Sequence, residues 1–222
     1  MRGLFVTGTG TGVGKTIVSA ALLASMRAVG EAVRAHKPVV TGLAEPAGQW
    51  PPDHELLALA AGMAPAEVAP LLYAPPVSPH LATALAGQSI DPAGVVTSAS
   101  ADPQRMVVVE GIGGLLVPLS DDFTVRDLAV ELGLPLVIAA SPGLGTINHT
   151  LLTLEAARTA GLHVAAVVLT PWPREPSEVE RSNRETIARL GGTEVATLRA
   201  VQRPDATDLA DAGASLPWRA WL

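Results

Sequence analysis

The chain has 222 residues, of which 48% are hydrophobic and 16% charged, and its formal net charge is -6. This composition excludes a disordered chain, and the lack of any lysine or arginine run argues against a nucleic-acid partner. Cysteine is absent, which excludes disulfides and a cysteine nucleophile and is compatible with the cytoplasm. The longest apolar region, residues 128–140, is interrupted by Glu131, Gly133 and Pro135, so no membrane span is expected.

The first half of the chain alternates between strand and helix patterns. Residues 3–6 form an apolar run that predicts a short buried strand, and residues 16–29 are apolar nearly all round, which predicts a buried helix. Residues 32–40 predict a second strand, and residues 53–62 a short helix. From residue 63 to residue 104 the many prolines and weak helical patterns predict mostly helix and loop.

The second half continues the alternation. Its predicted strands cover residues 106–110, 134–140, 163–170 and 193–198, and the first three are largely apolar. The helices between them are predicted at residues 124–133, 146–161 and 177–192, and the C-terminal tail gives no clear pattern. Apolar strands separated by helices indicate a mostly parallel sheet with helices on both faces. We therefore expect a single α/β domain over residues 1–222.

The segment GTGTGVGKT, residues 8–16, joins the first predicted strand to the first predicted helix. A glycine-rich turn in this position that ends in Lys-Thr is typical of a P-loop, which binds the phosphates of a nucleoside triphosphate. Glycines let backbone N–H groups turn inward on an anion, and the start of the helix adds further N–H groups. An ordinary flexible turn is the alternative. Nucleotide contacts are expected from Gly12, Val13, Gly14, Lys15, Thr16 and Ile17.

Two residues of this P-loop have expected roles of their own. Lys15 should reach the β- and γ-phosphates, and the Thr16 hydroxyl is placed to bind Mg²⁺. The usual spacing has a glycine five positions before Gly14, whereas Thr9 stands there in this chain and the glycine is Gly8. The loop is therefore one residue longer than the common form.

Three charged residues near the ends of predicted elements are further candidates. Glu110 ends a strand and is expected to hold the metal and the nucleotide, unless it is an ordinary surface acid. Lys37 lies near the end of the second strand, where parallel sheets carry their ligands, and its alternative is a solvated charge. Asp53 is either a helix cap or a metal and nucleotide ligand. Nucleotide contacts are also expected from the residues behind Glu110, which are Gly111, Ile112 and Gly113.

Together these segments resemble the dethiobiotin synthetase family, whose members close a ureido ring in the biotin pathway. The matching segments are VTGTGTGVGKT (6–16), HKPVVTG (36–42), Asp53 ahead of ELLALA, SPH (78–80), VEGIGGLLVPLSDDFTVRDLA (109–129) and LGTINHTLLTLEAARTAGL (144–162). They follow the family's order, and the longer P-loop is also the family's form. After about position 170 the resemblance thins.

The resemblance implies a homodimeric, Mg²⁺-dependent ligase that acts on 7,8-diaminononanoate, CO₂ and a nucleoside triphosphate, normally ATP. One substrate amine captures CO₂ as a carbamate, whose oxygen takes the γ-phosphate to form a mixed anhydride. The second amine then attacks the carbonyl carbon, which releases phosphate and closes the ring.

The resemblance also implies roles for individual residues. Lys15 and Lys37 would be catalytic and face the phosphoryl group and the carbamate. The metal would lie on Thr16, Asp53 and Glu110. The diamine substrate would contact Thr11, Lys37 and Thr41, and its carboxylate would bind the start of a helix from the other subunit, at Thr146, Ile147 and Asn148.

The chain departs from the family where the nucleotide base should bind. Family members commonly have Ala-Asn-Asp after the fifth strand, and the asparagine reads adenine. Here the segment is VLTPWP, which supplies no amide side chain. Base contacts are instead expected from Thr170, Pro171, Arg199, Ala200 and Val201, with weak discrimination between ATP and other triphosphates.

Two other classes share the predicted fold. A nucleotide-switched binding protein of the MinD or ParA type is the main alternative, but those proteins carry an extra lysine at the front of the P-loop, where this chain has Thr7. Membrane-bound members also end in an amphipathic helix, whereas this tail contains Gly213 and Pro217. An amide-forming relative from cobalamin synthesis would need a cysteine nucleophile to hydrolyse glutamine.

Overall fold

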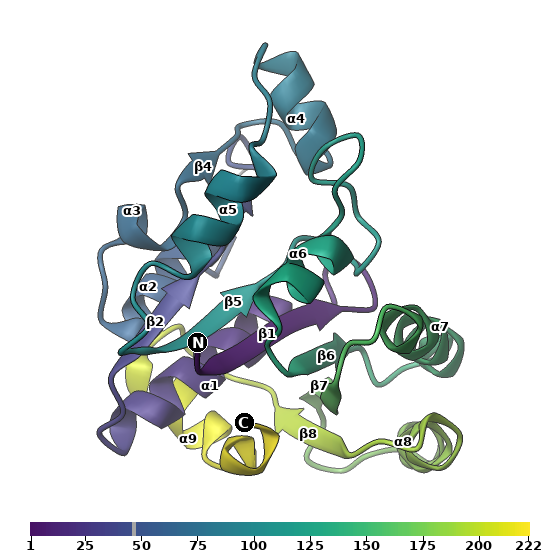
Figure 1. Ribbon diagram of the computed structural model, residues 1–222. Coiled ribbons are helices and arrows are strands. Elements are labelled where there is room, and N and C mark those ends of the chain that lie inside the picture. The colour runs from purple at the N-terminus through teal and green to yellow at the C-terminus, as the bar shows by residue number, and fades with distance from the viewer. Residues whose placement is uncertain (46–47) are drawn as a thin grey trace.

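A six-stranded parallel sheet forms the centre of the computed structural model, which describes residues 1–45 and 48–222 (Figure 1). The strands lie in the order β2-β5-β1-β6-β7-β8. They are β1 (Gly3–Gly8), β2 (Val33–His36), β5 (Met106–Glu110), β6 (Leu136–Ala140), β7 (Val164–Trp172) and β8 (Val195–Arg199). All neighbouring pairs run parallel, as the alternation of strand and helix patterns predicts. The predicted P-loop α/β fold is therefore confirmed.

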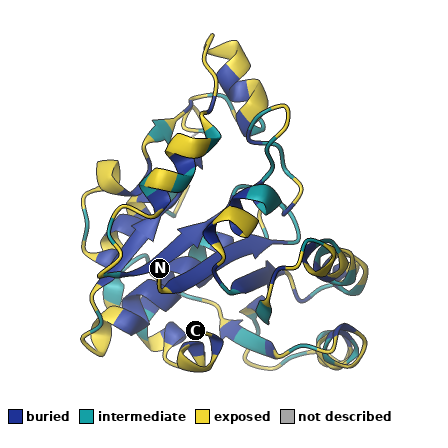
Figure 2. Ribbon diagram, viewed as in Figure 1, coloured by how far each residue is buried: buried dark blue, intermediate teal, exposed yellow. Residues whose placement is uncertain are grey.

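Helices cover both faces of this sheet, and each strand contributes side chains to both sides. In β1, Leu4 and Val6 pack into one hydrophobic cluster and Phe5 into the other, because successive side chains of a strand point to opposite faces. The first cluster is closed by α1 (Lys15–Ala28), α2 (Asp53–Ala61) and α9 (Ala206–Gly213). The second is closed by α5 (Pro92–Ala99), α6 (Val125–Leu132), α7 (Thr146–Thr159) and α8 (Glu178–Gly191). Figure 2 shows buried strands with exposed outer helix faces.

The strand predicted over residues 32–40 is in fact two strands, and this part of the prediction is wrong. β2 ends at His36, and β3 (Val39–Val40) pairs with β4 (Leu71–Leu72) in a separate two-stranded sheet. Pro38 has no backbone N–H and cannot continue a ladder. The N–H of Lys37 instead donates to the carbonyl of Val68 (2.9 Å), at the end of the short helix α3 (Pro65–Val68). Lys37 is thereby fixed between the two sheets.

The C-terminal tail, for which no pattern was predicted, is ordered against the helix that follows the P-loop. It forms α9 and a 3₁₀ helix, η1 (Trp218–Trp221). A Cβ atom on Gly213 would lie only 2.1 Å from the carbonyl oxygen of Ala21, so α9 approaches α1 closely. Trp218 and Trp221 are 4% and 3% exposed and join the same cluster. The Trp221 indole also donates to Glu194 Oε2 at 3.2 Å, just before β8, so the tail is held to both the cluster and the sheet.

One smaller difference concerns the length of β7. β7 continues past its predicted end at Thr170 as far as Trp172. The segment from residue 63 to residue 104 is mostly helix and loop as predicted, with α3, α4 (Pro79–Leu85), α5 and the short strand β4. None of the helices within the described residues combines the length and apolar character that a membrane crossing requires.

Arg34 and His36 lie on one side of β2 and are covered by the end of α5. Arg34 donates to the carbonyl oxygens of Ala99 (2.7 Å) and Ser98 (2.5 Å), and His36 Nε2 lies 3.3 Å from Ser98 Oγ. Burial and then the neighbouring Arg34 charge lower the pKa of His36 to about 3. The imidazole is therefore neutral in the folded protein near neutral pH.

This buried imidazole makes folding sensitive to acid. In the unfolded chain His36 binds a proton below about pH 6.5, whereas in the folded protein it stays neutral down to about pH 3. The free energy of unfolding is therefore unaffected by His36 above its unfolded-state pKa, and it falls as the pH drops below that pKa. Between pH 7 and pH 5 the wild type should lose about 2 kcal/mol more unfolding free energy than His36→Gln. Urea denaturation at both pH values measures this, and equal losses in the two proteins would contradict it.

Candidate active site

The carboxyl ends of β2, β5 and β1 lie side by side, and the loops that leave them meet there. β5 lies between the other two strands, and Val6 of β1 is in register with Glu110 of β5. His36, the last residue of β2, is in register with Val109. The P-loop, Lys37 and Glu110 are consequently brought together at one edge of the sheet, where ligands bind in open parallel sheets.

The P-loop has the backbone that its glycines predict. Gly12 and Gly14 adopt positive φ angles of 74° and 90°, which residues other than glycine rarely adopt. A Cβ on Gly14 would also lie 2.6 Å from Cγ2 of Thr170, so this glycine allows β7 and the P-loop to touch. Gly14 caps α1 without a side-chain hydrogen bond, which leaves the first N–H groups of the helix available to an anion.

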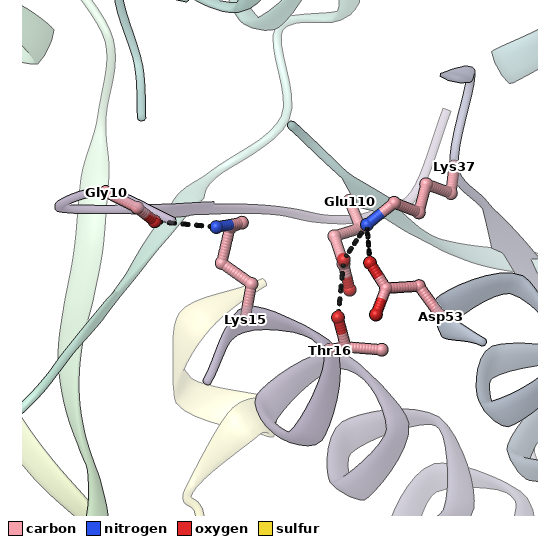
Figure 3. A network of polar contacts seen from close by, with 6 residues as sticks. All are labelled: Gly10, Lys15, Thr16, Lys37, Asp53 and Glu110. Carbon is pink, nitrogen blue, oxygen red and sulfur yellow. Dashed lines mark hydrogen bonds and ion pairs between the residues drawn. The ribbon is translucent and has the colours of Figure 1, made fainter. Parts of the chain in front are cut away.

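Lys15 folds back over its own loop. Its Nζ donates to the carbonyl oxygen of Gly10 at 2.7 Å (Figure 3), and the residue is 7% exposed. Burial lowers the pKa of Lys15, and the Lys37 charge adds to the effect, whereas the Glu110 carboxylate opposes it. The ammonium is held where phosphates would approach the loop.

A chain of polar contacts connects the P-loop helix to two other elements (Figure 3). The Thr16 hydroxyl donates to Glu110 Oε1 at 2.9 Å, and Lys37 Nζ donates to the same oxygen at 2.6 Å. Lys37 Nζ also donates to Asp53 Oδ2 at 2.5 Å. We call Thr16, Lys37, Asp53 and Glu110 the carboxylate–lysine network. It joins α1, the end of β2, the start of α2 and the end of β5.

Because the network is largely buried, the charges of its residues strongly affect one another. Glu110 is fully buried and Lys37 is 3% exposed. Burial alone would lower the pKa of Lys37, but the Glu110 and Asp53 carboxylates outweigh it and raise the pKa above its ordinary value. Burial would raise the pKa of Asp53, but Lys37 lowers it overall. Lys37 is therefore a permanent cation between two carboxylates at neutral pH.

These positions exclude the surface, solvent-exposed and helix-cap interpretations of the three charged residues. Glu110 is not a surface acid and Lys37 is not a solvated charge. Asp53 is not the helix cap, because Pro52 occupies the N-cap position of α2 and Asp53 lies in its first turn. Each side chain is instead directed into the network.

The network contains oxygen atoms of the kind that Mg²⁺ prefers. Thr16 supplies a hydroxyl, and Asp53 and Glu110 supply carboxylates. Glu110 Oε2 is buried without a hydrogen-bond partner in the described part of the chain, so it has capacity for a further ligand. Over the same residues no group of three or more His, Cys, Asp or Glu forms a metal cluster. The donor set therefore fits a cation whose coordination shell is completed by phosphates and water rather than a protein-only site.

The loop after β5 lies against the P-loop. A Cβ on Gly111 would be 2.7 Å from Cγ1 of Val125, so its lack of a side chain permits α6 to pack there. Gly113 has a φ of 62°, and a Cβ on it would lie 3.6 Å from the Thr11 hydroxyl. Ile112 packs against the second hydrophobic cluster. The structure thus places Thr11 beside the predicted nucleotide-binding residues that follow Glu110.

A cavity of about 460 Å³ opens beyond the P-loop, at the ends of β6, β7 and β8. The predicted residues Pro171 and Ala200 line it, and Thr170 lies between it and the P-loop through its contact with Gly14. Arg199 instead lines a separate cavity of about 580 Å³ beside β8, and Val201 packs against the first hydrophobic cluster. The other six wall residues were not assigned from the sequence: Ser141, Pro142, Gly143, Trp172, Pro173 and Glu180.

The predicted substrate residues are not all in one place. Thr41 is half-buried and follows β3, on the segment that begins with Lys37. Thr146, Ile147 and Asn148 form the first turn of α7, where Thr146 Oγ1 lies 3.4 Å from Thr150 Oγ1 and Asn148 is exposed. No hydrogen bond among the described residues joins this turn to the carboxylate–lysine network.

Comparison with known proteins identifies the family. A family model described as an AAA domain matches residues 2–201. The ATP-dependent dethiobiotin synthetase BioD of Anaeromyxobacter sp. (strain Fw109-5) is 44% identical over 202 residues, covering 86% of this chain and 90% of that protein. The protein of that name from Mycobacterium avium (strain 104) is 41% identical over 217 residues, covering 96% of this chain and 91% of that protein. The chain belongs to the dethiobiotin synthetase family.

Solved structures of other families share the fold of this dethiobiotin synthetase family member. A ParA family ATPase from Chlorobium tepidum TLS superposes with a TM-score of 0.54 at 14% identity, covering 96% of this chain and 90% of that one. Apo McdA from Cyanthece gives a TM-score of 0.53 at 12% identity, with the same coverage. At such identities the likeness concerns the fold alone. The family resemblance read from the sequence motifs is confirmed by the curated relatives.

Proposed function

We propose that this chain is an ATP-dependent dethiobiotin synthetase, a ligase that forms carbon–nitrogen bonds. It would convert 7,8-diaminononanoate and CO₂ to the cyclic urea dethiobiotin at the expense of a nucleoside triphosphate. The curated relatives bear this activity in their names and match over most of both chains. The ParA-type alternative has only distant similarity of fold in its favour. We propose the cytoplasm as the compartment, in keeping with the use of ATP.

The observation that carries the proposal is the placement of the lysines. The chain contains only two lysines, Lys15 and Lys37, and they are 7% and 3% exposed at the same edge of the sheet. Buried lysines are rare unless they are paired. A triphosphate and a carbamate are both anionic, and bringing them together requires fixed positive charge. A P-loop alone accounts for Lys15, whereas Lys37 supplies a second cation from another strand.

The first steps of the reaction depend on this positive charge. An ammonium group has no lone pair and cannot attack CO₂, and nearby cations favour the neutral form of a substrate amine. Lys37 would then face the carbamate that results. Lys15 would hold the terminal phosphates over the P-loop N–H groups.

Phosphoryl transfer and ring closure depend on the alignment of the reacting groups. The carbamate oxygen takes the γ-phosphoryl group, and the second amine attacks the activated carbonyl carbon to release phosphate. Such transfer depends on positioning and on charge neutralisation more than on covalent help from the protein. Mg²⁺ would be held by Thr16, Asp53 and Glu110, and when bound it would neutralise charge on the phosphates.

We also propose a homodimer in which the partner subunit completes the substrate site. The first turn of α7, with Thr146, Ile147 and Asn148, would offer its N–H groups to the substrate carboxylate across the interface. Two observations support an intersubunit role for this turn. Asn148 is exposed, and Leu144, two residues before this turn, is 97% exposed, so both are accessible to a partner subunit.

The activity is tested directly by product analysis. The purified protein is incubated with diaminononanoate, carbon-13 bicarbonate, Mg²⁺ and ATP, and the products are examined by mass spectrometry. We expect a cyclic urea that carries the label in its carbonyl group and forms in step with phosphate release. Hydrolysis of ATP that is not accelerated by the diamine and gives no cyclic urea would contradict the proposal.

Lys37→Gln tests the role of the second lysine. Without its positive charge, turnover should fall by roughly a hundredfold or more, since groups that stabilise developing charge contribute on this scale. Binding of Mg²⁺-ATP is measured by calorimetry at the same time, so that turnover is compared at saturating nucleotide, and the circular dichroism spectrum checks that the variant is folded. Turnover within a few-fold of wild type would remove Lys37 from the reaction.

The base cavity generates a prediction about nucleotide choice. Its lining includes Pro142, Pro171 and Trp172 and contains no asparagine or glutamine side chain to read adenine. We expect kcat/KM for ATP and GTP to agree within about tenfold, because apolar contacts discriminate weakly. Side-by-side kinetics with both triphosphates at saturating diamine measure this ratio. A strong preference for ATP would show that backbone groups or Glu180 read the base.

A further inference from the structure

Lys37 occupies one oxygen atom of each carboxylate that the proposed metal would use. Its Nζ lies 2.6 Å from Glu110 Oε1 and 2.5 Å from Asp53 Oδ2, and the Thr16 hydroxyl donates to the same Glu110 oxygen. Both carboxylates are therefore bonded to one ammonium group, and the hydroxyl shares the Glu110 oxygen with it. That ammonium supplies the compensating charge that buried carboxylates require.

A divalent cation on the same carboxylates would stand very close to this ammonium. Mg²⁺ binds oxygen ligands at about 2.0–2.1 Å, so a metal on Glu110 Oε1 would lie within a few ångströms of Lys37 Nζ in its present position. Two neighbouring cations in a buried site repel strongly because the effective dielectric constant is low. The metal and the ammonium therefore compete for Asp53 and Glu110.

The backbone of Lys37 is fixed, so the competition is resolved by its side chain. His36 belongs to β2, Pro38 follows, and the Lys37 N–H is bonded to the Val68 carbonyl at 2.9 Å. The side chain, in contrast, is a flexible four-carbon stem. The Asp53 side chain is 47% exposed, so a cation can approach this carboxylate from solvent.

We propose that Lys37 is an internal counter-ion that keeps free divalent cations off Asp53 and Glu110, so that the metal enters only together with the triphosphate. The phosphates add ligands and negative charge, which stabilise the metal and attract the displaced ammonium. Lys37 would then move from the carboxylates to the anionic reactants. This rests on the proposed function for the identity of those reactants, but the competition itself requires only the contacts above.

Lys15 provides an internal comparison. Its Nζ also contacts an oxygen of the chain, the Gly10 carbonyl at 2.7 Å, but this oxygen is no part of the donor set. The triphosphate alone should therefore change the surroundings of Lys15. Lys37 should respond only when metal accompanies the nucleotide.

Manganese binding in the absence of nucleotide tests the proposal. Mn²⁺ is titrated into the full chain and free metal is followed by electron paramagnetic resonance. Lys37→Met removes the charge but keeps an unbranched side chain, and it should bind Mn²⁺ roughly tenfold tighter or more than wild type because the competing cation is gone. Lys37→Arg keeps the charge and should bind as weakly as wild type.

A double variant locates the site, and a null result is decisive. Lys37→Met combined with Asp53→Asn should lose the gained affinity. Equal Mn²⁺ affinity in wild type and Lys37→Met, within about twofold, would overturn the proposal. No diamine or CO₂ is used, so the outcome is independent of whether the chain makes dethiobiotin.

A second measurement uses the wild-type protein, so it does not depend on whether a Lys37 variant folds. Because the chain has two lysines, labelling with ε-carbon-13 lysine gives two side-chain signals in wild type. A non-hydrolysable triphosphate with a chelator should shift the Lys15 signal alone, and adding Mg²⁺ should then shift the Lys37 signal. A Lys37 signal that shifts fully in the presence of chelator, or that shifts with millimolar Mg²⁺ alone, would contradict the exchange.

Discussion

The ion pair between Lys37 and Glu110 is the interaction on which the rest of the site depends. A fully buried carboxylate is costly unless a positive charge and hydrogen bonds compensate it, and here one ammonium at 2.6 Å and one hydroxyl at 2.9 Å do so. The pair joins the ends of two neighbouring strands and, through Thr16 and Asp53, the first turns of α1 and α2. A shift of the P-loop helix would therefore also move the oxygen atoms of Thr16, Asp53 and Glu110 relative to one another.

Much of this arrangement follows from local patterns in the sequence. The apolar strands, their alternation with helices and the glycine-rich turn before Lys15 predict a parallel sheet with a phosphate site at its carboxyl edge. Glu110 and Lys37 were identifiable because strand ends are where such sheets carry ligands. The burial of Glu110 and Lys37 and the contact between them depend on the strand order β2-β5-β1. No single segment of the sequence encodes this order.

Other features were not predictable because they arise from contacts between distant segments. The strand ladder breaks at Pro38, as expected of proline, but the N–H of Lys37 finds its partner in Val68, which is distant in the sequence. The tail lacks a pattern of its own and is ordered by packing against α1, where Gly213 meets Ala21. The cavity of about 460 Å³ combines residues from the ends of three strands, so Trp172 lines it only once β6, β7 and β8 lie side by side.

The scarcity of lysine has a practical consequence for chemical handling of the protein. Every other basic side chain apart from histidine is arginine, and both lysines lie inside the fold. Amine-directed crosslinkers, immobilisation resins and acylating reagents will therefore find no lysine on the molecular surface. Slow acylation at either lysine would instead report transient opening of the surrounding structure, which makes lysine modification rates a direct probe of local motion at the site.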